Sequence, residues 1–247
     1  MRIPKFFKKE NNLVKTPRIS SMIKRPIEEL VNLEEPAWPE YEEIIKKSPV
    51  NIAMIPVSEE HGRQTLFDLQ VTSRSPMGGV ALNTGGLVVD NGWLRFLGGG
   101  TTLMASLATA NNLDKENHLF NAGNIGYILV AYDVAGGHFA VDGGVLGSHG
   151  SIFYAGPDNA YQWDNLGFGY GQFLYWAISD PANLQEFYSN IRWKGWESDA
   201  IHVSLQQAYS FFPLLSTVEG QDIEKVNRRL VPIQEILSNA FKPAWTE

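Results

Sequence analysis

The stretch that decides the fold runs from Gly86 to Ser179 and contains GLVVDNGWLRF (86–96), YILVAYDVAGGHFAV (127–141) and SIFYAGPDNAYQW (151–163). Short apolar segments alternate with glycine pairs or polar turn residues, which is typical of strands joined by tight turns. The pattern predicts an antiparallel sheet whose last hairpin leads into an amphipathic helix. The segments are Leu87–Val89, Trp93–Leu97, Gly126–Tyr132, His138–Val141, Ser151–Ala155, Tyr161–Trp163 and the helix Gly171–Ile178.

Prolines and polar caps divide the rest of the chain. We expect one α+β domain over residues 26–247, in which a mixed or mostly antiparallel sheet has helices packed on one face. Residues 1–25 are expected to form a flexible basic tail, and residues 111–124 a loop. The further predicted strands are Asn51–Val57 and Val80–Leu82, and the further predicted helices are Ile27–Asn32, Glu40–Lys47, a helix capped by Ser58 and ending near Thr72, Leu103–Ala110, Asn183–Tyr188, Gln221–Leu230 and Ile233–Phe241.

Charge is distributed unevenly along the chain. Residues 1–25 hold eight basic residues and one acidic residue, a net charge of +7, whereas the remaining residues hold twelve basic and twenty-six acidic residues, a net charge of −14. The body should therefore repel nucleic acid and anionic membranes and attract a basic partner surface, since opposite potentials steer association. Phe6 and Phe7 within the basic run leave a membrane-surface role open for the tail.

Composition excludes several classes of protein. Hydrophobic residues make up 44% of the chain, with seven Trp and thirteen Phe, which is ample material for a packed core. The chain has no Cys, so disulfides, thiolate metal sites and Cys nucleophiles are absent. No apolar run reaches the length of a membrane span, and no apolar segment follows the N-terminal basic residues. We expect a cytoplasmic protein of undetermined oligomeric state.

Several blocks of sequence carry a family resemblance. The blocks LQVTSRSP (69–76), GGLVVDNGWLR (85–95), GFGY (167–170), FLYWA (173–177) and RWKGW (192–196), together with PIEEL (26–30) and PAWP (36–39), resemble a bacterial family catalogued as domain of unknown function 2625. More loosely, residues 85–180 are similar to the Smi1/Knr4-like (SUKH) superfamily. The Gly-Gly turn, the hairpin YILVAYDVAGG (127–137) and Phe173-Leu174 carry that likeness. It implies a protein-interaction module, and many SUKH members bind and neutralise toxins.

Patterns that would support catalysis are weak. Asp133 and Asp142 flank one predicted hairpin, where Asp more often forms a turn than a catalytic pair. The five histidines are scattered without a metal-binding spacing on one element. The run GGGTT (98–102) lacks the lysine of a phosphate-binding loop, and GSHGS (147–151) does not fit a nucleophile elbow. We therefore predict no catalytic residues, no metal and no cofactor.

Two sets of residues remain as binding candidates. A contact face for a basic protein partner would use Asp133 and Asp158 in turns, with Trp93 and Trp163 beside turns as anchors. This hypothesis describes a non-enzymatic binding protein, either a protein-interaction module or one of the toxin-immunity type.

The alternative hypothesis is a small-molecule-binding or hydrolytic enzyme. Its cleft would lie near Arg74, whose guanidinium could clamp an anion, with Asp90 as a carboxylate. A structural salt bridge is the simpler interpretation of Arg74.

Overall fold

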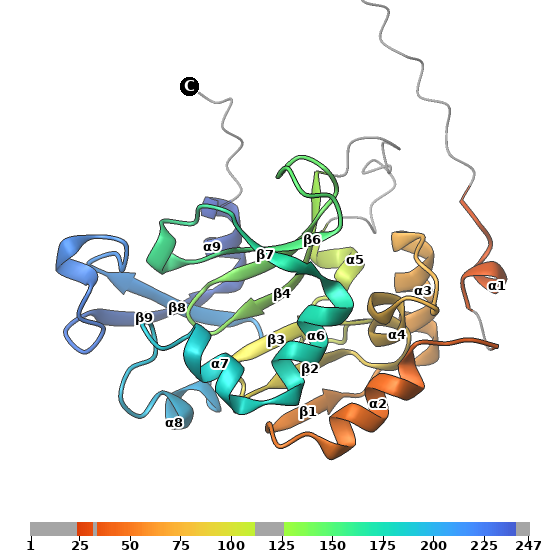
Figure 1. The fold of residues 1–247 in the computed structure, drawn as a ribbon, viewed down its shortest axis with the longest axis horizontal. Coiled ribbons are helices and arrows are strands. Elements are labelled where there is room, and N and C mark those ends of the chain that lie inside the picture. Colours follow the sequence, from red (N-terminus) through yellow and green to blue (C-terminus); the bar gives the residue numbers. More distant parts are fainter. Residues whose placement is uncertain (1–23, 32–33, 112–125, 241–247) are drawn as a thin grey trace, which may run out of the picture.

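The computed structural model describes residues 24–31, 34–111 and 126–240, and its main sheet confirms the α+β prediction. Seven strands form one antiparallel sheet in which neighbours in space are also neighbours in sequence (Figure 1). Strands joined by short turns must be antiparallel neighbours, which explains this order within residues 86–97 and within residues 127–169. The strands are β1 (Ile52–Ile55), β2 (Gly86–Val89), β3 (Leu94–Leu97), β4 (Tyr127–Asp133), β5 (His138–Asp142), β6 (Ser151–Ala155) and β7 (Asp164–Gly169).

Backbone conformation at the turns explains where strands begin. Asp90, Asn91 and Gly92 have φ angles of 53°, 56° and 90°, a conformation that Asp and Asn tolerate and Gly favours, so the predicted tight turn is confirmed. The strand predicted at Tyr161–Trp163 is wrong. A 3₁₀ turn, η1 (Pro157–Asn159), and positive φ angles at the next two residues delay β7 until Asp164.

Helices begin where the sequence supplies a cap. The Ser58 Oγ accepts a hydrogen bond from the His61 amide at 3.2 Å, as predicted for the helix that follows. The strand predicted at Val80–Leu82 is wrong, because Ser75 caps a helix whose first residue is Pro76. The helices are α1 (Ile27–Leu30), α2 (Trp38–Lys47), α3 (Glu59–Leu69), α4 (Pro76–Asn83), α5 (Leu107–Ala110), α6 (Tyr170–Ser179), α7 (Pro181–Phe187), α8 (Trp196–Ala200) and α9 (Ile233–Ala240).

One face of the sheet packs against α6. The ring of Phe173 lies 4.7 Å from that of Phe139 and 4.9 Å from that of Phe96, measured between centroids. Phe173, Leu174 and Ala177 are all fully buried. Helices α2 and α4 contact α6 in turn, which builds a helical layer over this face (Figure 1). Burial of these aromatic side chains supplies much of the apolar driving force for the fold.

The other face carries a row of side chains that crosses six strands. In the strand register, each residue of this row lies directly opposite the next one on the neighbouring strand. From β1 to β6 the row consists of Ala53, Val88, Arg95, Tyr132, His138 and Ala155. Residues opposite one another on adjacent strands point to the same side of a sheet. The row therefore shows which residues form the second face, where the chain after residue 200 packs.

The buried Arg95 attaches the C-terminal part of the chain to this second face. Its guanidinium donates hydrogen bonds of 2.9–3.0 Å to the carbonyls of Gly92, Val203, Ser204 and Gln207. A two-stranded sheet of β8 (Gln207–Phe212) and β9 (Asn227–Pro232) follows. The helix predicted at Gln221–Leu230 is therefore wrong. The last residues of this segment instead belong to β9, which pairs residue by residue with β8.

The N-terminal tail and the 111–124 loop lie almost wholly outside the described residues. Of the tail, Lys24 and Arg25 are described: the Lys24 ammonium lies 3.6 Å from the Asp68 carboxylate, and Arg25 hydrogen-bonds to Gln70 at the end of α3. Within the described ranges, no helix has the length and apolar character needed to cross a membrane.

Candidate functional site: a cavity beside His138

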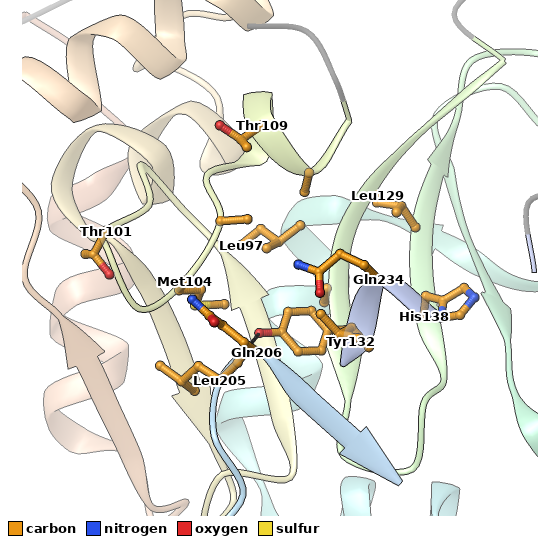
Figure 2. A pocket seen from close by; sticks show the side chains of 14 residues that line it. Leu97, Thr101, Met104, Thr109, Leu129, Tyr132, His138, Leu205, Gln206 and Gln234 are labelled. Atoms are coloured by element: carbon orange, nitrogen blue, oxygen red, sulfur yellow. Dashed lines mark hydrogen bonds between the residues drawn. The ribbon is translucent and has the colours of Figure 1, made fainter. Parts of the chain in front are cut away.

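A cavity of about 540 Å³ lies between the second face of the sheet and the C-terminal chain. Strands β3 to β5 form one wall, and the segment before β8 and the start of α9 face them across the opening (Figure 2). Thr101 and His138 lie at opposite ends (Figure 2). The lining residues are Leu97, Thr101, Met104, Ala105, Thr109, Ala110, Leu129, Ala131, Tyr132, His138, Leu205, Gln206, Ile233 and Gln234.

The polar groups on the cavity wall are uncharged. The Tyr132 hydroxyl donates a 2.5 Å hydrogen bond to the Leu205 carbonyl, which fixes the ring against the C-terminal segment. The Gln206 amide donates to the Thr102 carbonyl at 3.3 Å. Gln234 extends toward Leu97 and Tyr132 in Figure 2. An apolar wall with a few neutral polar groups is the usual composition of a site that binds a small ligand or an apolar side chain.

His138 is the titratable group at the inner end of the cavity. Its side chain is fully buried, and its ring stacks on Tyr161 with centroids 5.5 Å apart and planes at 22°. Trp163 packs edge-on at 6.3 Å. Burial lowers the pKa of His138 from 6.5 to about 4, so the imidazole is neutral at physiological pH.

The buried Asp133 carboxyl lies near three phenols, those of the buried Tyr154 and Tyr188 and of the half-buried Tyr161 that stacks on His138. Asp133 Oδ1 accepts a 2.8 Å hydrogen bond from the Gly137 amide across the β4–β5 turn. Tyr154, Tyr161 and Tyr188 lie close enough to Asp133 for its carboxylate to raise their pKa values, although burial is the main cause. Burial also raises the pKa of Asp133 from 3.8 to about 7.

The predicted turn residues Asp133 and Asp158 come together near the Tyr154 phenol. A Cβ added at Gly137 would clash with both Asp133 Oδ2 and the Tyr154 hydroxyl, and one added at Gly156 would clash with that hydroxyl and approach Asp158 Oδ1. The Tyr154 hydroxyl therefore lies near both carboxyls. Asp158 is exposed, whereas Asp133 is fully buried.

Two residues of the predicted contact face are buried. Asp133 is a turn former, as its bond to Gly137 shows, and is not at the surface. Trp93 is also fully buried, with ring centroids 5.1–5.4 Å from those of Tyr188, Trp193 and Trp196. The expectation of an exposed Trp93 is wrong because the chain at 188–200 covers the β2–β3 turn.

The remaining contact-face tryptophan, Trp163, is half-buried. Its ring packs 5.0 Å from that of Tyr127, near the inner end of the cavity.

Arg74 and Asp90, the candidates for a cleft, have different partners. Arg74 is exposed and forms an ion pair with Glu35 at 2.5 Å, which agrees with the simpler interpretation of a surface salt bridge. Asp90 pairs with the buried Arg192 at the β2–β3 turn. A second cavity, of about 590 Å³, includes Asp90 and Arg192 in its lining, and Arg74 is not among its lining residues.

Sequence reasoning missed the two buried arginines, Arg95 and Arg192. The Arg192 guanidinium is enclosed by the rings of Trp93, Tyr188 and Trp196, at 4.9, 5.1 and 3.8 Å from their centroids. The concentration of Trp around Arg192 in RWKGW (192–196) is a signal for such an enclosure. Arg95 lies within the predicted strand at 93–97, where a charge between apolar neighbours indicates a buried bonding partner.

Metal binding has no candidate in the part of the chain that the structure describes, since no group of three or more His, Asp or Glu residues is placed to hold an ion. The chemistry available at the His138 cavity is therefore that of a neutral imidazole, amides and hydroxyls beside an apolar wall.

The fold and cavity together define an α+β protein built on a seven-stranded antiparallel sheet with a ligand-sized apolar cavity on one face. The chain belongs to the family described as protein of unknown function DUF2625, whose model matches residues 27–236. It is 34% identical over 213 residues to the putative uncharacterized protein YbfG of Escherichia coli (strain K12), covering 86% of this chain and 94% of that protein. It is 31% identical over 209 residues to an uncharacterized protein of Haemophilus influenzae, covering 84% and 90%. The sequence resemblance to this family is thus confirmed.

Proposed function

We propose that this protein is a non-enzymatic binding protein and that its target inserts a neutral, largely apolar group into the cavity beside His138. The observation that carries the proposal is the cavity itself: about 540 Å³, with aliphatic side chains, one phenol ring and a neutral imidazole on its walls. A cavity of this size is sufficient for an aromatic or branched aliphatic group.

The neutral state of His138 sets the chemistry of the target. Desolvation that keeps the imidazole uncharged would equally penalise a charged ligand group placed beside it. The amides of Gln206 and Gln234 can each donate and accept a hydrogen bond. They suit a ligand that carries a carbonyl, amide or hydroxyl on an apolar body.

Binding of N-phenyl-1-naphthylamine, an uncharged apolar fluorophore, tests this proposal. The variant Ala105→Trp places a large ring at the half-buried rim of the cavity, and Ala182→Trp makes the same change at an exposed position of α7. We expect the wild type and Ala182→Trp to bind the probe equally and Ala105→Trp to bind at least about tenfold more weakly. Absence of binding to the wild type, or equal binding by all three proteins, would contradict the proposal.

A second candidate function is a protein-interaction module that recognises a basic partner, such as a toxin of the kind that many SUKH members neutralise. The net charge of −14 on residues 26–247 favours this partner, because it would accelerate association with a positive surface. The succession of the β4–β5 hairpin, β6, β7 and α6 agrees with the order of elements in that superfamily.

Affinity capture at low and high salt, followed by charge reversal, tests this second candidate. A basic partner captured through contacts at Asp158 should be lost at high salt and should bind Asp158→Lys more weakly. Glu29→Lys, an exposed change of the same charge on α1, serves as the control. A partner that binds both variants and the wild type equally would argue against a contact face at Asp158.

A further inference from the structure

The edge strand β1 differs from the other strand edges of the molecule. It is the terminal strand of the seven-stranded sheet and pairs only with β2. Its residues Ile52-Ala53-Met54-Ile55 include no charged residue, no Gly and no Pro. Natural sheets usually protect an edge with a charge, a proline, a bulge or a covering element.

The other strands that lie at a sheet edge, β7, β8 and β9, are each protected. Strand β7, at the opposite edge of the same sheet, has Asp164, two glycines and an irregular register with β6. Strand β9 contains Arg228, Arg229 and a terminal Pro232. Strand β8 is fastened to the main sheet by the bond from the Tyr209 amide to the Val134 carbonyl. Among the described strands with a free edge, β1 is therefore the most suitable template for another strand.

Hydrogen-bonding groups of β1 point away from the sheet at two positions. The Asp90 amide bonds to the Asn51 carbonyl, so the main-chain groups of residues 51, 53 and 55 face β2. By alternation, the amides and carbonyls of Ile52 and Met54 point to the outer edge. The hydrogen bonds found within the described ranges include none from outside the sheet to the main chain of these two residues.

A groove with apolar and polar lining residues lies on the second face of the sheet beside this edge, since Ala53, Val88 and Arg95 of the cross-strand row line it. Its volume is about 610 Å³, with Ala53, Ile55 and Val88 on the sheet side and Leu103 and Ile201 opposite. Leu103 and Ile201 are 64% and 63% exposed. Met54, 43% exposed, lies on the opposite face of β1 from Ala53 and Ile55 and does not line the groove. Exposed large apolar side chains that gather beside a free strand edge are typical of an interaction surface.

We infer that β1 and this groove bind an extended segment of another protein, which pairs with Ile52 and Met54 as an added strand and carries basic residues beside an apolar stretch. Strand addition obtains its affinity from main-chain hydrogen bonds and its specificity from pockets for alternate side chains. The basic character follows from charge complementarity. The body carries −14, and the exposed Glu59 and Glu60 follow within five residues of the end of β1. A second copy of this chain would bring the same negative charge and is disfavoured. The inference does not depend on the cavity beside His138.

Two labelled peptides test the inference, KKVTVTVKK and EEVTVTVEE, which share an alternating apolar centre and differ in the sign of their flanks. We expect the lysine-flanked peptide to bind at least about tenfold more tightly at low salt, as measured by fluorescence anisotropy. Binding should slow hydrogen exchange at the amides of Ile52 and Met54 and leave that of Ala53, already bonded to β2, unchanged.

Matched variants separate main-chain pairing from side-chain contact. Met54→Pro removes one outward amide without removing a bond to β2, and we expect it to weaken the lysine-flanked peptide by about fivefold or more. Met54→Leu keeps the amide and should bind like the wild type. Both variants should keep the wild-type affinity for N-phenyl-1-naphthylamine, which separates this test from that of the cavity.

Three results would overturn the inference. The first is that neither peptide binds, and the second is that a peptide binds without slowing hydrogen exchange at the amides of Ile52 and Met54. The third is that exchange at those amides slows as the protein concentration rises in the absence of peptide, which would identify a second copy as the occupant of the edge.

Discussion

Replacing either Asp133 or His138 by a residue that does not titrate should reveal a pH dependence of stability. In the wild-type protein the opposite contributions of the two residues hide it. Burial raises the pKa of Asp133 from 3.8 to about 7, so between these pH values the folded state holds a proton that the unfolded chain has lost. Its contribution to stability therefore falls as pH rises through this window. Burial lowers the pKa of His138 from 6.5 to about 4, so there the unfolded chain holds the additional proton, and stability rises with pH.

The two effects cancel between pH 4 and 6.5, where the windows overlap. One proton of difference corresponds to about 1.4 kcal/mol per pH unit, or about 3 kcal/mol across the overlap. Relative to the wild type, Asp133→Asn should gain stability by about that amount as pH rises from 4 to 6.5. His138→Phe should lose a similar amount, and the double variant should follow the wild-type profile.

Urea denaturation monitored by tryptophan fluorescence at several pH values gives these free energies of unfolding. Subtracting the wild-type profile removes the contribution of every other titrating group. Asn at position 133 can still accept the bond from the Gly137 amide, so the turn is retained. If the profile of Asp133→Asn runs parallel to that of the wild type, Asp133 is ionised normally in the folded protein and the reasoning is refuted.

The two buried arginines give further predictions of stability. Arg95→Met removes four hydrogen bonds to carbonyls and should lower the free energy of unfolding by about 3 kcal/mol, measured by urea titration. An unchanged urea midpoint of unfolding would show that solvent replaces those bonds. Asp90→Asn keeps a residue that tolerates the positive φ angle but leaves the Arg192 cation enclosed without its carboxylate. We expect a loss of about 3 kcal/mol there, measured in the same way, whereas a loss within error would mean that the aromatic rings alone hold Arg192.

Most of the sheet could be predicted from the sequence because the hairpins β2–β3, β4–β5, β5–β6 and β6–β7 are local. Alternating apolar residues and turn signals such as Asn91-Gly92 identify strands without reference to the rest of the chain. The wrong strand at Val80–Leu82 lies where two local signals compete. Ser75-Pro76 is an adequate helix start, but the apolar Val80–Leu82 and the turn residues 83–86 after it indicate a hairpin strand instead of α4.

The candidate site could not be predicted in the same way. Trp93 borders a turn, and a turn is normally exposed, but the chain more than ninety residues later covers it through Arg192. The cavity likewise joins His138 with Gln206 and Gln234, whose positions depend on the bonds from Arg95 to the 203–207 segment. Contacts of such long sequence separation have no local pattern. The assignment of Asp133 as a turn former succeeded because its partner, Gly137, lies only four residues away.

The connection of the C-terminal chain to the sheet has a consequence for how the protein opens. The bonds from Arg95 span 108 to 112 residues and that from Tyr132 spans 73, whereas each strand of the main sheet pairs with the next strand along the chain. Closing so long a loop costs entropy that local pairing avoids, so residues 203–236 should dock last during folding and detach first under mild denaturation. The cavity wall formed by Leu205, Gln206, Ile233 and Gln234 belongs to this late-docking segment. Detachment of the segment would let an occupant enter while the sheet stays intact. A bound occupant would in turn stabilise the docked state of the segment.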